Sequence, residues 1–158
     1  MRILALDQST TNSGWSYFID GKYVDSGVIS KSNRDTDHRI AEMGLAISAK
    51  IKELQPDITI IEDIQNQKGV KTVIQLARLQ GCIMLYCQSK KIDFKFWHPS
   101  EWRSILEFQQ GPRVKREELK AQSMKYVKEH FGFDNYTEDR CEAICIGEAA
   151  SKFFDETK

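Results

Sequence analysis

The segment Ile58–Glu62 constrains the fold of this chain more than any other part of its sequence. It begins with four consecutive β-branched residues and shows no alternation of apolar and charged side chains. Strands with one solvated face alternate, whereas an unbroken run is typical of a central strand that is covered on both faces. We therefore predict a sheet with helices packed on both sides, with Glu62 at the end of a central strand.

Three further strands are expected near the N-terminus. Ile3–Asp7 is an apolar run that also ends in an acid, and the short runs Trp15–Ile19 and Val24–Ile29 follow it closely. The turn Asp20-Gly21-Lys22 separates the second and third runs. Consecutive strands joined by short turns predict an antiparallel meander.

Helical spacing of apolar residues dominates the remaining chain. The expected helices span residues 38–54, 70–90, 100–108, 114–130 and 138–154, and a further strand spans residues 94–97. The predicted order is βββαβαβααα, which fits an α/β protein with a mixed sheet. A length of 158 residues suits one compact domain covering residues 1–158.

Charge and hydropathy indicate which partners and which cellular location the protein has. Basic and acidic residues number 23 each, so no global field attracts a charged partner. No stretch approaches the ~20 apolar residues of a membrane span, and the N-terminus lacks the core of a signal peptide. We therefore expect a cytoplasmic protein with no membrane partner.

The four cysteines do not form a pattern typical of a metal site or a disulfide framework. Cys82 and Cys87 are five residues apart, and Cys141 and Cys145 are four apart, unlike the CxxC spacing of zinc sites. Most lie among apolar residues in helical segments, so we interpret them as small buried hydrophobic residues.

Four carboxylates form the main candidate site. Asp7 and Glu62 end apolar strands, where α/β proteins build sites, and Asp139 and Glu142 share one face of the last expected helix. A turn, an exposed strand end and a helix N-terminus would explain three of these acids separately. They do not explain Glu142, which continues an apolar stripe. Four converging carboxylates would repel one another unless Mg²⁺ or Mn²⁺ bridged them.

Three motifs carry a resemblance to a known family. They are Leu4-Ala5-Leu6-Asp7-Gln8-Ser9, Ile60-Ile61-Glu62-Asp63, and Asp139-Arg140-Cys141-Glu142-Ala143-Ile144-Cys145-Ile146. Together, in this order, they resemble the RuvC-type Holliday junction resolvases of the ribonuclease H-like superfamily, most nearly the phage-encoded members. The resemblance implies a mixed five-stranded sheet with helices on both faces.

The resemblance also implies an activity and its cofactors. It implies a homodimer that resolves four-way junctions by paired nicks that leave 5′-phosphate ends, with other branched DNA as a further candidate substrate. Two Mg²⁺ ions, or Mn²⁺, would be held by the four carboxylates, since two such ions roughly 4 Å apart catalyse phosphodiester cleavage. The implied metal ligands are also the implied catalytic residues, namely Asp7, Glu62, Asp139 and Glu142.

Basic residues supply candidate contacts to DNA. Lys120 matches a lysine of the family and is a candidate catalytic residue, because a lysine near the scissile phosphate stabilises developing negative charge. The candidate DNA-binding residues are Arg103, Lys115, Arg116, Lys120, Lys68 and Lys71. The alternative is a solvated helix face on which lysines pair with acids one turn away.

Other functions remain open from the sequence. The segment Asp7–Gly14 also resembles the first phosphate loop of actin-like sugar kinases, although a second such loop is missing. A YqgF-type resolvase or RNA nuclease is a relative of the same class, and a non-catalytic DNA-binding module would not need the acids. Within the resolvase family, Gln65 stands where an aromatic residue is frequent, and Glu142 stands where Asp is commoner.

Overall fold

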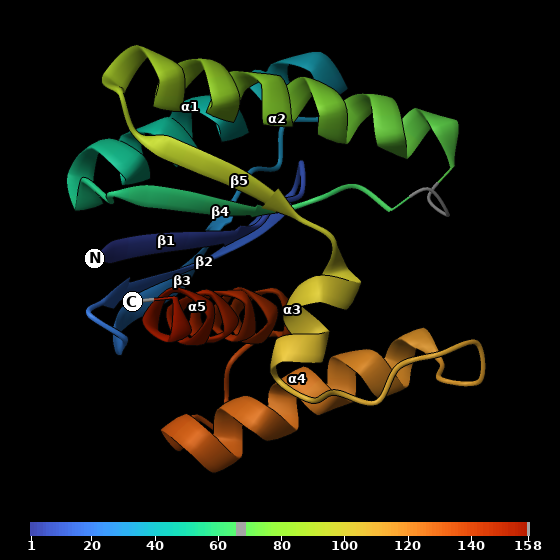
Figure 1. Ribbon diagram of the computed structural model, residues 1–158. Helices are drawn as coiled ribbons and strands as arrows, with labels where there is room; N and C mark the ends of the chain where they lie inside the picture. Colours follow the sequence, from blue (N-terminus) through green and yellow to red (C-terminus); the bar gives the residue numbers. More distant parts are fainter. Residues whose placement is uncertain (66–68, 158) are drawn as a thin grey trace.

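Five strands form one mixed sheet in the computed structural model, which describes residues 1–65 and 69–157 (Figure 1). The strands are β1 (Arg2–Asp7), β2 (Asn12–Ile19), β3 (Lys22–Ser30), β4 (Ile58–Glu62) and β5 (Asp93–Trp97). Their order across the sheet is β3-β2-β1-β4-β5. The first three strands pair antiparallel, and β4 lies parallel to both β1 and β5. The predicted meander and the predicted element order are confirmed.

Helices cover both faces of this sheet. They are α1 (Thr36–Leu54), α2 (Val70–Lys90), α3 (Pro99–Ile105), α4 (Arg116–Phe131) and α5 (Glu138–Glu156). Figure 1 shows α1 and α2 above the sheet and α5 below it, with α3 and α4 on the side of α5. The sheet is therefore the middle layer of three, as the sequence predicts.

Alternating side chains of β1 serve the two layers in turn. Leu4 and Leu6 belong to the core beneath α1 and α2, whereas Ile3 and Ala5 belong to the core beneath α5. Buried apolar surface stabilises a fold by about 25 cal/mol per Å², so both layers hold the strand in register. The run Ile58–Ile61 is buried throughout, which confirms the prediction of a central strand.

The predicted helix over residues 100–108 is too long. The observed α3 ends at Ile105, and Glu107 has a positive φ of 59°. This reversal brings Phe108 back against Trp102, with ring centroids 5.7 Å apart. Packing of an aromatic pair therefore ends the helix before its apolar periodicity does.

The structure bears on two further expectations, the burial of the cysteines and the lack of a membrane span. Cys87, Cys141 and Cys145 are buried, as predicted, whereas Cys82 is exposed on α2. Among the helices of the described residues, none combines the length and the hydrophobicity that a membrane crossing requires.

Candidate active site

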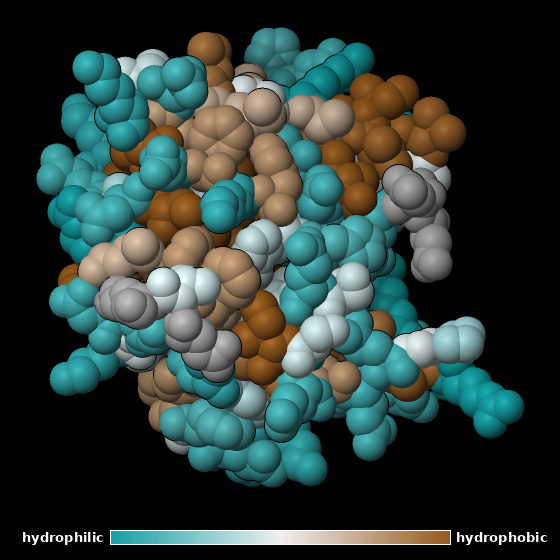
Figure 2. All heavy atoms as spheres, in the orientation of Figure 1, coloured by the Kyte–Doolittle hydropathy of each residue, from teal (hydrophilic) through white to brown (hydrophobic). Residues whose placement is uncertain are grey.

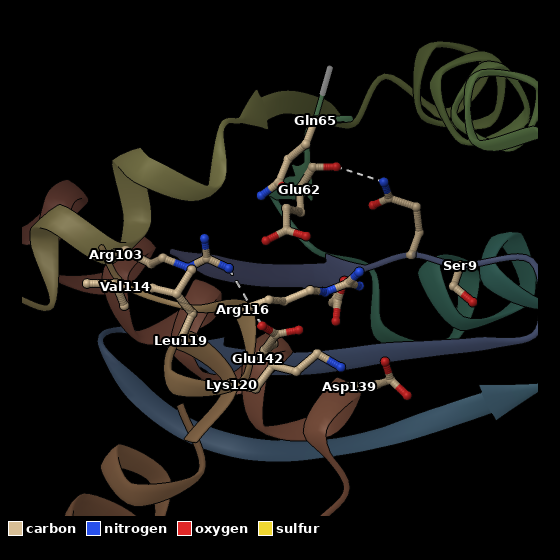
Figure 3. A pocket seen from close by; sticks show the side chains of 12 residues that line it. Ser9, Glu62, Gln65, Arg103, Val114, Arg116, Leu119, Lys120, Asp139 and Glu142 are labelled. Carbon is tan, nitrogen blue, oxygen red and sulfur yellow. Dashed lines mark hydrogen bonds and ion pairs between the residues drawn. The ribbon is translucent and has the colours of Figure 1, made fainter. Parts of the chain in front are cut away.

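The four predicted acids line one pocket of about 490 Å³ (Figure 3). Asp7 ends β1 and Glu62 ends β4, and the parallel pairing of Leu6 with Ile61 puts these ends side by side. The carboxyl ends of parallel strands meet at one edge of a sheet, which is where α/β proteins bind ligands.

A glycine brings the other two acids to this edge. Gly14 on β2 pairs with Asp7, and a Cβ atom at Gly14 would lie only 2.0 Å from the backbone oxygen of Asp139. The first turn of α5 therefore approaches the sheet more closely than any side chain at this position would allow. Asp139 in this turn and Glu142 one turn farther along α5 both line the pocket.

Three other carboxylates lie near Asp7. Burial, followed by the nearby carboxylates of Glu62, Glu142 and Asp139, raises the pKa of Asp7 well above its ordinary value. Burial also raises the pKa of Asp139. The charged forms of these acids are therefore destabilised in the protein alone, and a bound cation would relieve that cost.

Carboxylate oxygens are the donors that Mg²⁺ and Mn²⁺ prefer, so the residues fit such cations by type and by their shared pocket. They are not gathered into a finished ligand cage. Within residues 1–65 and 69–157, no group of three or more His, Cys, Asp or Glu residues is arranged so that it could hold a metal ion as it stands. Glu62 instead accepts a hydrogen bond from Trp102, and Glu142 pairs with Arg103.

Three of the predicted basic residues line the same pocket, namely Arg103, Arg116 and Lys120. Lys120 forms an ion pair with Glu138, and this carboxylate raises the pKa of the lysine. Lys120 therefore stays cationic through the neutral range. Arg103 is buried, and its Nη2 lies 3.7 Å from Oε1 of Glu142, so it faces the acids and not the solvent.

The other predicted basic residues lie elsewhere. Lys115 is exposed at the start of α4 and is outside the residues that line the pocket. Lys71 is exposed in the first turn of α2 and lines a separate groove with Asp37 and Arg78. Lys68 falls outside the described residues. Gln65 does line the pocket, and Figure 3 shows its side chain beside Glu62.

Sequence reasoning missed two contacts of Glu62. The indole nitrogen of Trp102 donates to Oε1 of Glu62 at 3.0 Å. Gln8 donates through Nε2 to the backbone oxygen of Glu62 at 2.7 Å, and its own Oε1 is buried with no hydrogen-bond partner within the described part of the chain. The only available signal was the polar residue Gln8 directly after a strand that ends in an acid.

A comparison with models of known protein families gives a match. A sequence model described as "Crossover junction endodeoxyribonuclease RuvC" matches residues 3–110. A protein of that name from Brachyspira hyodysenteriae is 26% identical, with 100% of both chains covered. Another from Borrelia turicatae is 32% identical over 112 residues, which cover 67% of this chain and 69% of the relative.

Solved structures share the fold. The structure of RuvC from T. thermophilus in complex with Holliday junction substrate superposes with a TM-score of 0.79 at 10% identity, covering 99% of this chain and 96% of the other. The complex of Fowlpox virus resolvase with substrate Holliday junction DNA gives a TM-score of 0.70 at 13% identity, covering 98% and 99%. The predicted ribonuclease H-like fold is therefore confirmed.

Proposed function

The chain belongs to the RuvC family of crossover junction endodeoxyribonucleases, and on this premise we propose that it is a metal-dependent endonuclease that resolves four-way DNA junctions. Each active site would nick one strand, and paired nicks would leave 5′-phosphate ends. A cytoplasmic location stays a prediction. Family membership also favours this reading over the sugar-kinase and non-catalytic alternatives, because the family is one of nucleases.

One observation carries the proposal. The pocket joins Asp7, Glu62, Asp139 and Glu142 from three separate elements, with Arg116 and Lys120 in the same lining. A lining that combines acids with cations suits a substrate that is itself an anion and is held through divalent cations. A structural role would not explain why the acids share a pocket in which burial and mutual repulsion raise the pKa of Asp7.

We assign each carboxylate the role of a metal ligand, with Mg²⁺ or Mn²⁺ as the ion. Two such ions, when bound, supply the Lewis acidity that phosphodiester hydrolysis needs. The protein supplies their oxygen donors, and burial strengthens the charge interactions of Asp7. Arg103 holds Glu142 at the wall of the pocket.

The cationic residues bind and orient the DNA backbone in this proposal. Lys120 and Arg116 lie within the pocket lining, so we assign them contacts to phosphates next to the scissile bond. Lys115 and Lys71 are exposed outside the pocket, and we assign them contacts to phosphates farther along an arm of the junction.

A second copy of the chain is the proposed partner. The α2 helix carries exposed apolar side chains at Val70 (77% exposed), Ile74 (45%) and Leu85 (72%). Figure 2 shows hydrophobic atoms gathered at the upper right, where α2 begins in Figure 1. Two symmetry-related strands require two active sites, and a two-fold dimer with this helix at its interface would provide them.

Light scattering tests the dimer. We expect the wild type to have twice the mass of one chain and Leu85→Asp to shift toward the monomer, because a buried charge without a partner disfavours association. Val24→Asp on β3, 50% exposed and far from α2 in the fold, is the matched control and should leave the mass unchanged. A wild type that is monomeric throughout the concentration series contradicts the dimer.

Cleavage of defined substrates tests the function. A labelled four-way junction, a Y-fork and a linear duplex are incubated with the protein in Mg²⁺, in Mn²⁺ and in EDTA. We expect metal-dependent symmetric nicks in the junction and little cutting of the duplex. Ligation of the products with no added kinase would establish the 5′-phosphate ends, and no metal-dependent cutting of any branched substrate would overturn the proposal.

A further inference from the structure

The short helix α3 has a well-defined start beside the candidate active site. Pro99 is its first residue, and His98 and Glu101 form a reciprocal capping box across its first turn. Pro at this position is already set in the helical φ range, and a capping box satisfies backbone donors that would otherwise lack partners. The proline and the capping box therefore fix the direction in which the following side chains of α3 point.

Trp102 is presented directly to Glu62. Its side chain is fully buried, and its Nε1 donates to Oε1 of the Glu62 carboxylate at 3.0 Å. A buried N–H group needs an acceptor, and here the acceptor is a carboxylate that lines the pocket. Phe108 packs edge-on against the indole, so the ring has little freedom to turn.

The next residue of α3 contacts a second acid. The Arg103 guanidinium pairs with Glu142 across 3.7 Å and lies 4.9 Å from the Trp102 ring centroid. One turn of α3 thus contacts carboxylates that come from β4 and from α5. Trp102 and Arg103 would therefore hold the carboxylates of Glu62 and Glu142 at a fixed separation.

The backbone of Glu62 is held as well. Its carbonyl oxygen accepts hydrogen bonds from Gln8 at 2.7 Å and from Gln80 at 3.2 Å. Gln8 directly follows β1, and Gln80 lies on α2. With the backbone fixed at this point, rotation about the side-chain bonds is the main freedom left to Glu62, and the indole N–H acts on that freedom.

We propose that Trp102 is a positioning residue whose indole N–H orients the Glu62 carboxylate for binding a divalent cation. The inference rests on the proposed function, since it needs Glu62 to be a metal ligand. A donor that holds a ligating carboxylate pre-organises it, and loss of such a group typically weakens metal affinity by roughly 10–100-fold. The effect belongs to metal binding itself, and so it is measurable without DNA.

Calorimetric titration of the protein with Mn²⁺ and with Mg²⁺ tests the proposal. Trp102→Phe keeps most of the ring but removes the N–H, and we expect the metal Kd to rise about tenfold or more. Trp97→Phe is the matched control, since Trp97 is buried in the same core with its ring 5.5 Å from that of Phe153. Equal affinities in the wild type and Trp102→Phe would overturn the proposal.

A second measurement follows the indole N–H groups directly by NMR spectroscopy. The chain has three tryptophans, so ¹⁵N spectra contain three indole signals, and Trp15→Phe and Trp97→Phe assign them. We expect Mg²⁺ to shift the Trp102 signal most, and Glu62→Gln to shift the same signal without Mg²⁺. A Trp102 signal unaffected by both changes would overturn the positioning role.

Failure of this inference and failure of the proposed function give different results. If the wild type cuts junctions and binds metal, but Trp102→Phe binds metal equally well, Trp102 has no positioning role and the function stands. If the wild type neither binds metal nor cuts junctions, the function fails and the inference fails with it. Retained metal binding by Trp97→Phe together with weakened binding by Trp102→Phe supports both.

Discussion

Lys120 Nζ lies 2.5 Å from Oε2 of Glu138, so the candidate catalytic lysine is held by an acid outside the four predicted ligands. Both side chains are partly exposed, and a pair of this kind is worth roughly 0.2–1 kcal/mol. If Lys120 contacts a phosphate as proposed, DNA would compete with Glu138 for the lysine, but only against a weak interaction.

Lys120→Ala should lower the junction cleavage rate on the order of 10²-fold, because it removes a cation beside the proposed scissile phosphate. Glu138→Gln should instead strengthen junction binding by up to roughly fivefold at low salt, because Lys120 is freed for the DNA. Single-turnover cleavage and a binding titration measure the two effects. Loss of cleavage in Glu138→Gln comparable to that in Lys120→Ala would contradict this role for the ion pair.

Asp7→Asn should abolish cleavage but keep junction binding. Loss of a proposed metal ligand is expected to cost at least about 10³-fold in rate, equivalent to about 4 kcal/mol of transition-state stabilisation. Gel-shift and cleavage assays on the same four-way junction separate the two properties. A variant that still nicks at more than a tenth of the wild-type rate would remove Asp7 from the proposed site.

The same substitution should stabilise the metal-free protein. Burial and neighbouring carboxylates raise the pKa of Asp7, so its charged form costs stability, and this cost grows as the pH rises above the unfolded pKa of about 3.9 toward the raised folded pKa. A neutral amide lacks this cost, and each kcal/mol regained raises Tm by about 2–4 °C. Thermal unfolding in EDTA measures the gain, and a lower Tm for Asp7→Asn than for the wild type would speak against the repulsion.

Gly14→Ala should disturb the site through the backbone. Its Cβ would lie 2.0 Å from the Asp139 carbonyl oxygen, so α5 must shift away from β2. Overpacking of this kind costs about 1–3 kcal/mol, and we expect metal affinity to fall with stability. Gly147→Ala is the matched comparison. Gly147 lies on α5 away from the pocket, and a Cβ atom there would lie 2.5 Å from the Phe18 ring. Equal metal affinities in these two variants would contradict a special role for Gly14.

Thiol labelling should separate the cysteines. Cys82 is exposed and should react quickly in the native protein, whereas the three buried cysteines should react only after unfolding. Burial raises the pKa of Cys141 to about 11, so its thiol stays neutral and unreactive in ordinary buffers. Its contribution to stability is complete below the unfolded pKa near 8.5 and is lost as the pH rises toward 11. Mass spectrometry of labelled peptides checks the order of reaction.

Local patterns in the sequence predicted most of the fold. The β-branched run Ile58–Ile61 predicted a buried central strand, and the periodicity of Val70–Lys90 predicted a helix whose observed bounds are the same. The end of α3 was wrong, because Phe108 turns back onto Trp102 through a contact that no periodicity reports. Asp7 and Glu62 were found because an apolar strand that ends in a carboxylate stands out locally, and Glu142 was found because it continues an apolar helix stripe.

The sequence by itself determined which segments are strands and helices, and which acids end strands or lie near the start of the last helix, because hydrophobic periodicity and capping are local properties. Only the tertiary structure decided what those acids contact. Trp102 reaches Glu62 across 40 residues of sequence, and Ser16 on β2 donates to the carbonyl of Ala143 on α5 across 127. Arg103 faces Glu142 inside the protein, although its sequence context suggested a surface contact to DNA. Side-chain partners depend on how distant elements pack, and that packing has no signature within either segment alone.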